Sequence, residues 1–171
     1  MNRWLLLLFV CVSCHRPEQA PPVDEEAARE HMIGANRILV QQEAEDIRDF
    51  IVRHGWTMQK TGTGLHYEIF QEGRGRMPVA GAPLTISYTV YLLDGTFCYA
   101  TDSLRPMTFL PGKGQQPRGL EEALERMREG SRSRLVLPAH LAYGTAGDGN
   151  KIPGNSALYY DVQLIKISDE K

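Results

Sequence analysis

The side chains that could carry out chemistry in this sequence of 171 residues are three cysteines, five histidines and seven tyrosines. The histidines, at positions 15, 31, 54, 66 and 140, have no spacing to cysteines or carboxylates that would hold a metal ion, so no metal site is expected. Gly112-Lys113-Gly114 lacks the remainder of a phosphate-binding loop. Two features remain, a pair of cysteines near the start of the sequence and the tyrosines from residue 88 onward.

The paired cysteines lie at the end of an apolar run. Arg3 precedes nine apolar residues from Trp4 to Val12, a run far shorter than the roughly 20 residues of a membrane-spanning helix and typical of a secretory signal peptide. Ser13-Cys14, a small residue followed by cysteine, resembles the lipobox of bacterial lipoproteins, although Cys11 stands where leucine is usual. The resemblance implies cleavage after residue 13 and a lipid on Cys14 that anchors the protein to a membrane. The alternative is an ordinary signal peptide with incidental cysteines.

The segment after the signal peptide is expected to contain a tether and a helix. Residues 14–23 include three prolines and indicate a tether. Residues 24–56 are expected to form a helical segment, with Asp24 as its cap and Gly55 as its stop. Its apolar residues recur at helical spacing: Ile33, Val40, Ala44, Ile47 and Ile51. This stripe is expected to pack on the protein's own domain, and the alternative is a dimer formed through the helix.

The remainder of the chain has the alternating pattern of strands. The expected strands are residues 65–69, 84–92, 97–99, 107–110, 132–137 and 157–167, with a hairpin turn at Asp94-Gly95. Residues 57–64 are expected to be a linker, and residues 143–155 a long surface loop. One short helix, Leu120–Met127, interrupts the strands. A single helix among several strands predicts an α+β domain whose sheet curls around that helix.

The charge of the chain excludes one class of partner. The 19 basic and 21 acidic residues give a formal charge of −2. A nucleic-acid-binding domain normally carries a strongly basic surface, so no nucleic-acid partner is expected.

Several short motifs stand in a fixed order between residues 65 and 167. They are Tyr88-Thr89, Leu93-Asp94-Gly95-Thr96, Phe109-Leu110-Pro111-Gly112, Arg118-Gly119-Leu120, Leu141-Ala142-Tyr143-Gly144, Ile152-Pro153-Gly154-Asn155 and Tyr160-Asp161-Val162. In this order they resemble the FKBP-type peptidyl-prolyl cis-trans isomerase domain, here over residues 65–168. The resemblance implies an FKBP-like antiparallel sheet of five or six strands curled around one short helix, with a substrate pocket between them. With the signal peptide and the acidic helix, the sequence is similar to the gliding-motility-associated FKBP-like lipoproteins.

The resemblance also implies which residues form the site. Tyr88, Tyr99 and Tyr143 fall at the catalytic positions, and in relatives the hydroxyl at the Tyr143 position bonds the bound peptide. The implied substrate-binding residues are Cys98, Met107, Phe109, Gln116, Pro117, Leu120, Ile152 and Tyr160. Rotation about the bond before proline makes and cuts no bond, so no nucleophile, metal or cofactor is required.

Some of these residues depart from the family pattern. Cys98 stands at a phenylalanine position, Tyr99 at an aspartate position and Leu120 at a tryptophan position, while Gln116-Pro117 replaces two apolar residues. A register shift of one residue would let Phe97 take the phenylalanine position. Without an acidic acceptor and an indole, we expect weak or altered isomerase activity.

The sequence therefore predicts a lipid-anchored isomerase of the cell envelope that assists the folding of exported, proline-containing polypeptides. The alternative is a non-catalytic FKBP-like module that binds peptide segments or supports an envelope machine.

Overall fold

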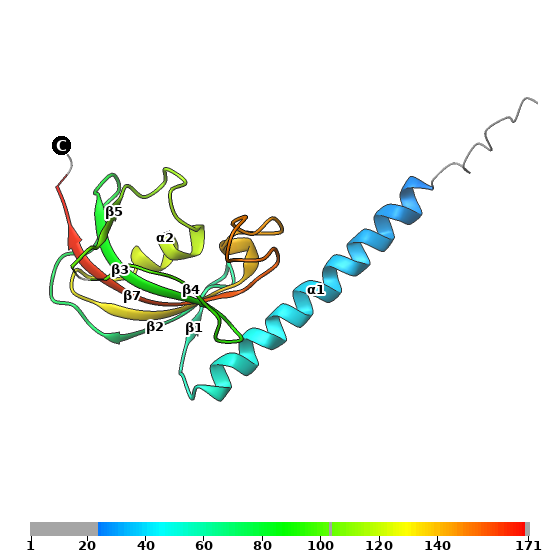
Figure 1. The fold of residues 1–171 in the computed structure, drawn as a ribbon, viewed down its shortest axis with the longest axis horizontal. Coiled ribbons are helices and arrows are strands. Elements are labelled where there is room, and N and C mark those ends of the chain that lie inside the picture. Colours follow the sequence, from blue (N-terminus) through cyan, green and yellow to red (C-terminus); the bar gives the residue numbers. More distant parts are fainter. Residues whose placement is uncertain (1–23, 103, 170–171) are drawn as a thin grey trace, which may run out of the picture. The chain divides into compact units, whose positions relative to one another are not determined.

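The computed structural model describes residues 24–102 and 104–169 (Figure 1). The predicted signal peptide of residues 1–13, the predicted lipidation site Cys14 and the predicted tether of residues 14–23 lie outside the described residues. The elements are α1 (Glu25–Arg53), β1 (Gln59–Lys60), β2 (His66–Gln71), β3 (Leu84–Leu92), β4 (Phe97–Ala100), β5 (Met107–Phe109), α2 (Arg118–Leu124), β6 (Arg132–Leu137), the 3-10 helix η1 (Ala139–Leu141) and β7 (Leu158–Ile167). Among the described residues, no helix is both long and apolar enough to cross a membrane.

The strands form one antiparallel sheet in the order β1-β2-β6-β7-β3-β4, and β5 pairs with β3. The described part of the chain thus contributes seven strands, where the resemblance implied five or six. The additional strand is β1, in the segment that was expected to be a linker. Its two residues pair with β2 across a turn in which the Thr61 amide donates to the Leu65 carbonyl (2.9 Å) and Gly64 has a φ of +99°.

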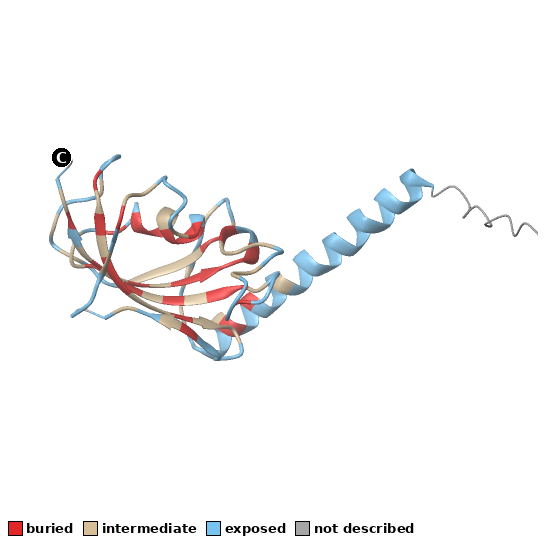
Figure 2. Cartoon of the chain, turned by 45° about the horizontal axis from the view of Figure 1, so that its top comes forward, coloured by how far each residue is buried: buried red, intermediate tan, exposed pale blue. Residues whose placement is uncertain are grey.

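The sheet curves around α2, as the sequence pattern predicts (Figure 1). The helix contributes Leu120, Ala123 and Leu124 to the main core, and buried residues follow the strands that face it (Figure 2). The predicted helix boundaries, Leu120 and Met127, are wrong by a few residues. Helix α2 begins after Pro117 and ends at Leu124, because the following turn is tightened by bonds from the Arg126 and Met127 amides to carbonyls three residues back.

Helix α1 agrees closely with its predicted bounds. The Asp24 carboxylate accepts hydrogen bonds from the Glu26 and Ala27 amides at 3.1 and 3.2 Å, and Gly55 follows the helix with a φ of +66°. The chain from Arg37 onward forms one compact unit.

Within this unit, the last turns of α1 pack on the outer face of the sheet. Ile47 and Phe50 form a second core cluster with Val136 of β6, so this part of the helix packs on the protein's own domain as predicted. Val40 and Ala44 belong to the same stripe but are exposed, and for these two residues the prediction is wrong. The apolar contact of α1 begins at Ile47, and one turn earlier the Glu43 carboxylate reaches the domain, where it accepts a hydrogen bond from the Ala139 amide at 2.6 Å.

Candidate functional site

Four tyrosines from different elements meet on the α2 side of the sheet. Tyr88 lies on β3, Tyr99 on β4, Tyr160 on β7, and Tyr143 in the loop after η1. Tyr160 is almost completely buried, and the other three are partly buried against the same core. The ring centroids of Tyr88 and Tyr160 are 5.8 Å apart. The structure thus brings together all three predicted catalytic tyrosines and one predicted substrate-binding residue.

The environment of these tyrosines keeps their hydroxyls protonated. Burial is the main cause that raises the pKa values of Tyr88, Tyr143 and Tyr160. The neighbouring phenols Tyr143 and Tyr99 raise the pKa of Tyr88 further. The interaction between the phenols of Tyr143 and Tyr160 lowers the pKa of Tyr143 and raises that of Tyr160. Protonated hydroxyls in an apolar surrounding can donate hydrogen bonds to a carbonyl oxygen.

Tyr99 is already engaged by a residue that was not among the predicted site residues. Its hydroxyl donates to Asp148 Oδ2 at 2.5 Å. This bond is the main cause that raises the pKa of Tyr99 and lowers the pKa of Asp148. From the sequence, Asp148 is expected to be a turn former, and it is one, since Oδ1 accepts bonds from the Asn150 and Ile152 amides. Its contact with Tyr99 crosses 49 residues of sequence, so no local signal indicates it.

A second contact missed by sequence reasoning lies beside the first. The Lys151 ammonium donates to the Cys98 carbonyl at 2.9 Å and lies 5.1 Å from the ring centroid of Tyr99 and 5.4 Å from that of Phe97. Phe97 is half exposed and Cys98 is buried, so a one-residue shift in register does not bring Phe97 into the core.

The remaining predicted binding residues lie beneath or beside the tyrosines. Phe109 and Ile152 are almost completely buried, and Leu120 is completely buried. Met107 Sδ accepts a hydrogen bond from Gln116 Nε2 at 3.1 Å. Pro117 is buried and caps α2. The buried members therefore support the site from below, and burial raises the pKa of the Cys98 thiol, consistent with a small apolar core residue.

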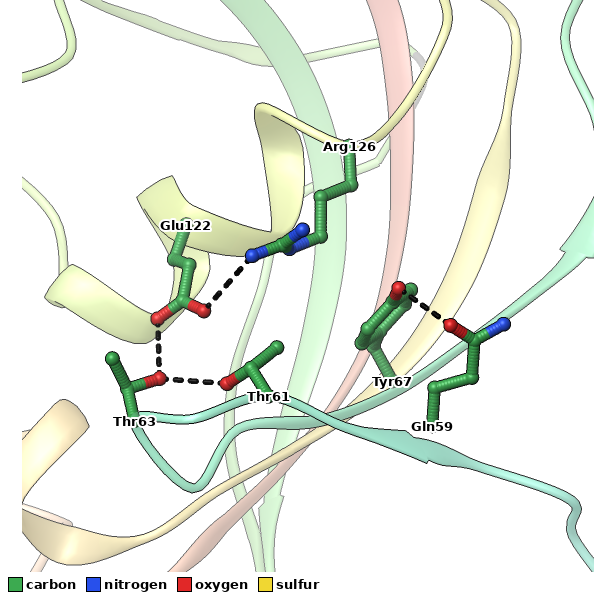
Figure 3. A network of polar contacts seen from close by, with 6 residues as sticks. All are labelled: Gln59, Thr61, Thr63, Tyr67, Glu122 and Arg126. Carbon is green, nitrogen blue, oxygen red and sulfur yellow. Dashed lines mark hydrogen bonds and ion pairs between the residues drawn. The ribbon is translucent and has the colours of Figure 1, made fainter.

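A polar network fixes α2 against the edge of the sheet (Figure 3). Glu122 of α2 accepts hydrogen bonds from Thr63 (2.7 Å) and from Arg126 (3.4 Å). Thr63 also bonds Thr61 at 2.7 Å, in the turn between β1 and β2. This turn therefore holds the helix that supports the site, which gives the Thr-Gly-Thr-Gly segment a structural role.

The antiparallel sheet, the single inner helix and the grouped tyrosines together define an α+β domain of the FKBP-like class. The model of the FKBP-type peptidyl-prolyl cis-trans isomerase family matches residues 74–165, which is more than half of the chain. The chain belongs to this family and is an FKBP-type peptidyl-prolyl cis-trans isomerase, as the sequence motifs indicate.

Relatives and solved structures agree with this assignment. The chain is 37% identical over 105 residues to an FK506-binding protein of Neisseria meningitidis serogroup B, covering 61% of this chain and 96% of that protein. It is 41% identical over 112 residues to the macrophage infectivity potentiator of Trypanosoma cruzi, covering 64% of this chain and 56% of that protein. A peptidyl-prolyl cis-trans isomerase structure from Pseudomonas syringae pv. tomato has the same fold, with a TM-score of 0.63, 24% identity and coverage of 75% of this chain and 96% of that one.

The site suits the reaction of this family. Rotation about an X–Pro bond faces a barrier of about 18–20 kcal/mol because it breaks amide resonance. Apolar groups such as Phe109 and Ile152 solvate the polar planar amide poorly, and protonated phenols such as Tyr143 can hold the carbonyl oxygen of the twisted form. Each tenfold gain in rate requires about 1.4 kcal/mol of preference for the twisted amide.

Proposed function

We propose that this isomerase is a lipid-anchored enzyme of the cell envelope that assists the folding of exported, proline-containing polypeptides. The observation that carries the proposal is the order of features in the sequence. A short apolar run and a lipobox-like Ser13-Cys14 precede a tether, a helix and the isomerase domain. An anchored catalyst would meet chains that emerge from the membrane, where uncatalysed isomerisation takes tens to hundreds of seconds. The similarity to gliding-motility-associated lipoproteins is part of this proposal.

Replacement of Cys14 by serine will abolish lipidation. In cells fed a palmitate analogue, the wild-type protein should be labelled and recovered with membranes, whereas Cys14→Ser should be unlabelled. Cys11→Ser is the matched control, because it removes the other cysteine of the same run and should keep both label and membrane association. Equal labelling of Cys14→Ser and wild type would contradict the proposed anchor.

We also infer that the isomerase activity is reduced relative to other members of the family. The acidic position of the family pattern is occupied by Tyr99, whose hydroxyl is used by Asp148, and Leu120 offers no indole to the site. In a proline-peptide assay, we expect kcat/KM about tenfold or more below that of the Pseudomonas syringae isomerase measured in parallel. Equal rates would contradict the reduced activity. Catalysis no faster than background would favour the non-catalytic peptide-binding alternative.

We infer in addition that α1 joins two copies of the protein. Ile33 and Val40 are seven residues apart, the spacing at which two helices pack side by side, and Ile33 is 53% exposed. Leu39 and Val40 are each 56% exposed, and a second helix would cover them. Sedimentation should find dimers of the wild-type chain and monomers of Leu39→Glu/Val40→Glu, while Gln41→Glu on the same turn should stay dimeric. A wild-type chain that stays monomeric at high concentration would contradict the proposed dimer.

A further inference from the structure

The loop between η1 and β7 is shaped around Asp148 and Ile152. The backbone amide of Asp148 donates to the Ile152 carbonyl at 3.0 Å, and the Ile152 amide donates back to Asp148 Oδ1 at 2.8 Å. Asp148 therefore holds both backbone polar groups of Ile152. Since the Ile152 side chain is 3% exposed and belongs to the main core, the position of Asp148 fixes this wall of the site.

Two further hydrogen bonds join the same loop to β4. Tyr99 donates to the second carboxylate oxygen of Asp148, and Lys151 donates to the Cys98 carbonyl. The Lys151 ammonium also lies over the faces of the Tyr99 and Phe97 rings, where a cation is attracted by the aromatic quadrupole. The two bonds lie close together, because Asp148 and Lys151 belong to the same turn, which leads directly into Ile152.

We propose that Tyr99, Asp148 and Lys151 form a clasp that fixes loop 142–157 to β4 and thereby positions Ile152 and Tyr143 for substrate binding. In this assignment Tyr99 is a positioning residue, and its hydroxyl does not contact the reacting amide. The hydroxyls of Tyr88 and Tyr143 remain for the substrate. The inference rests on the isomerase activity of the family, and it differs from the catalytic role that the sequence alone suggests for Tyr99.

An open clasp would weaken substrate binding more than it slows the chemical step. A loop free to leave β4 spends only part of its time in the binding-competent arrangement, and the apparent dissociation constant rises by the inverse of that fraction. Once a substrate has bound, the loop is back in place and the bond rotates at the original rate. KM should therefore increase while kcat stays nearly constant. A hydroxyl that stabilised the twisted amide directly would behave differently, because its loss lowers kcat and kcat/KM equally.

The test uses the whole chain carrying Cys14→Ser and compares three variants. Tyr99→Phe removes only the hydroxyl, Lys151→Met removes only the ammonium, and the third combines them. Tyr91→Phe is the matched control, since Tyr91 packs beside Phe97 but outside the clasp. Each protein is assayed with a proline peptide for KM and kcat, and amide hydrogen exchange is measured at Ile152, whose amide is held by Asp148.

The expected result is a KM about fivefold higher in each single variant, with kcat within about twofold of the parent. Exchange at Ile152 should be faster in the single variants, faster again in the double variant and unchanged in Tyr91→Phe. Unchanged exchange in all variants would overturn the clasp. A parallel loss of kcat and kcat/KM in Tyr99→Phe without faster exchange would also overturn it and make Tyr99 a substrate contact. If the parent shows no catalysis, the isomerase activity has failed, and the exchange rates alone still decide on the clasp.

Discussion

Alanine at position 147 will lower kcat/KM about tenfold or more, whereas alanine at position 149 will leave it within about threefold of wild type. Both glycines lie in the same loop with nearly the same φ, +70° and +72°. Holding an alanine in this left-handed backbone conformation costs about 1–2 kcal/mol at either position. The two sites differ in the space around them. A Cβ at 147 would lie 2.2 Å from the Ile152 carbonyl oxygen, while a Cβ at 149 would have nothing within 4 Å.

The clash at 147 involves backbone, so the loop itself must move. Movement there breaks the bond between the Asp148 amide and the Ile152 carbonyl and displaces the buried Ile152 side chain. We expect Gly147→Ala to lower the free energy of unfolding by about 3 kcal/mol, and Gly149→Ala by about 1 kcal/mol. Urea unfolding and a proline-peptide assay measure the two effects. Equal losses in the two variants would show that the left-handed backbone alone matters and that contact with Ile152 does not.

The parts of the fold predicted from sequence are those that local patterns determine. The alternation in residues 84–92 predicts β3 because its alternate apolar side chains, such as Leu84, Ile86 and Val90, lie in the main core. The Asp24 cap and the Gly55 stop predict α1 for the same reason, since each acts on its neighbours in sequence. The two-residue strand β1 has no such pattern. It exists because the turn after Lys60 reverses the chain, so that β2 pairs with Gln59 and Lys60.

The site divides in the same way. The ordered motifs place Tyr88, Tyr143 and Tyr160 together, and the structure brings these residues into one cluster. Asp148 has a sufficient local role as a turn former, so its sequence surroundings give no reason to pair it with Tyr99. That pairing depends on where β4 and the loop meet in three dimensions. Position 99 thus has a tyrosine where the family pattern has an aspartate, and a carboxylate from the loop, that of Asp148, accepts the hydrogen bond of this tyrosine's hydroxyl.

The phenol of Tyr160 will make the protein unfold in alkali. Its side chain is 2% exposed, and burial, followed by the charges of Tyr143 and Tyr88, raises its pKa above the ordinary value. In the unfolded chain the phenol titrates near pH 10, at roughly its reference pKa. Because the folded pKa is the higher one, the stabilisation is complete below about pH 10 and is lost as the pH rises towards the folded pKa. Each pH unit in that range removes about 1.4 kcal/mol of unfolding free energy for this one proton.

Tyr160→Phe removes this titrating proton. The unfolding free energy of the variant should therefore fall less steeply with rising pH above about pH 10. At neutral pH the variant should be less stable than wild type by about 1 kcal/mol, because the polar interaction of the Tyr160 hydroxyl with Tyr143 is lost. Above about pH 11 the order should reverse, since wild type must keep a buried phenol protonated and the variant need not. Tyr159→Phe is the control, as Tyr159 is only half-buried and the positive charge of Arg134 opposes the effect of burial on its pKa. Urea unfolding from pH 7 to 12 measures all three proteins, and parallel curves for wild type and Tyr160→Phe would contradict the assignment of the slope to this phenol.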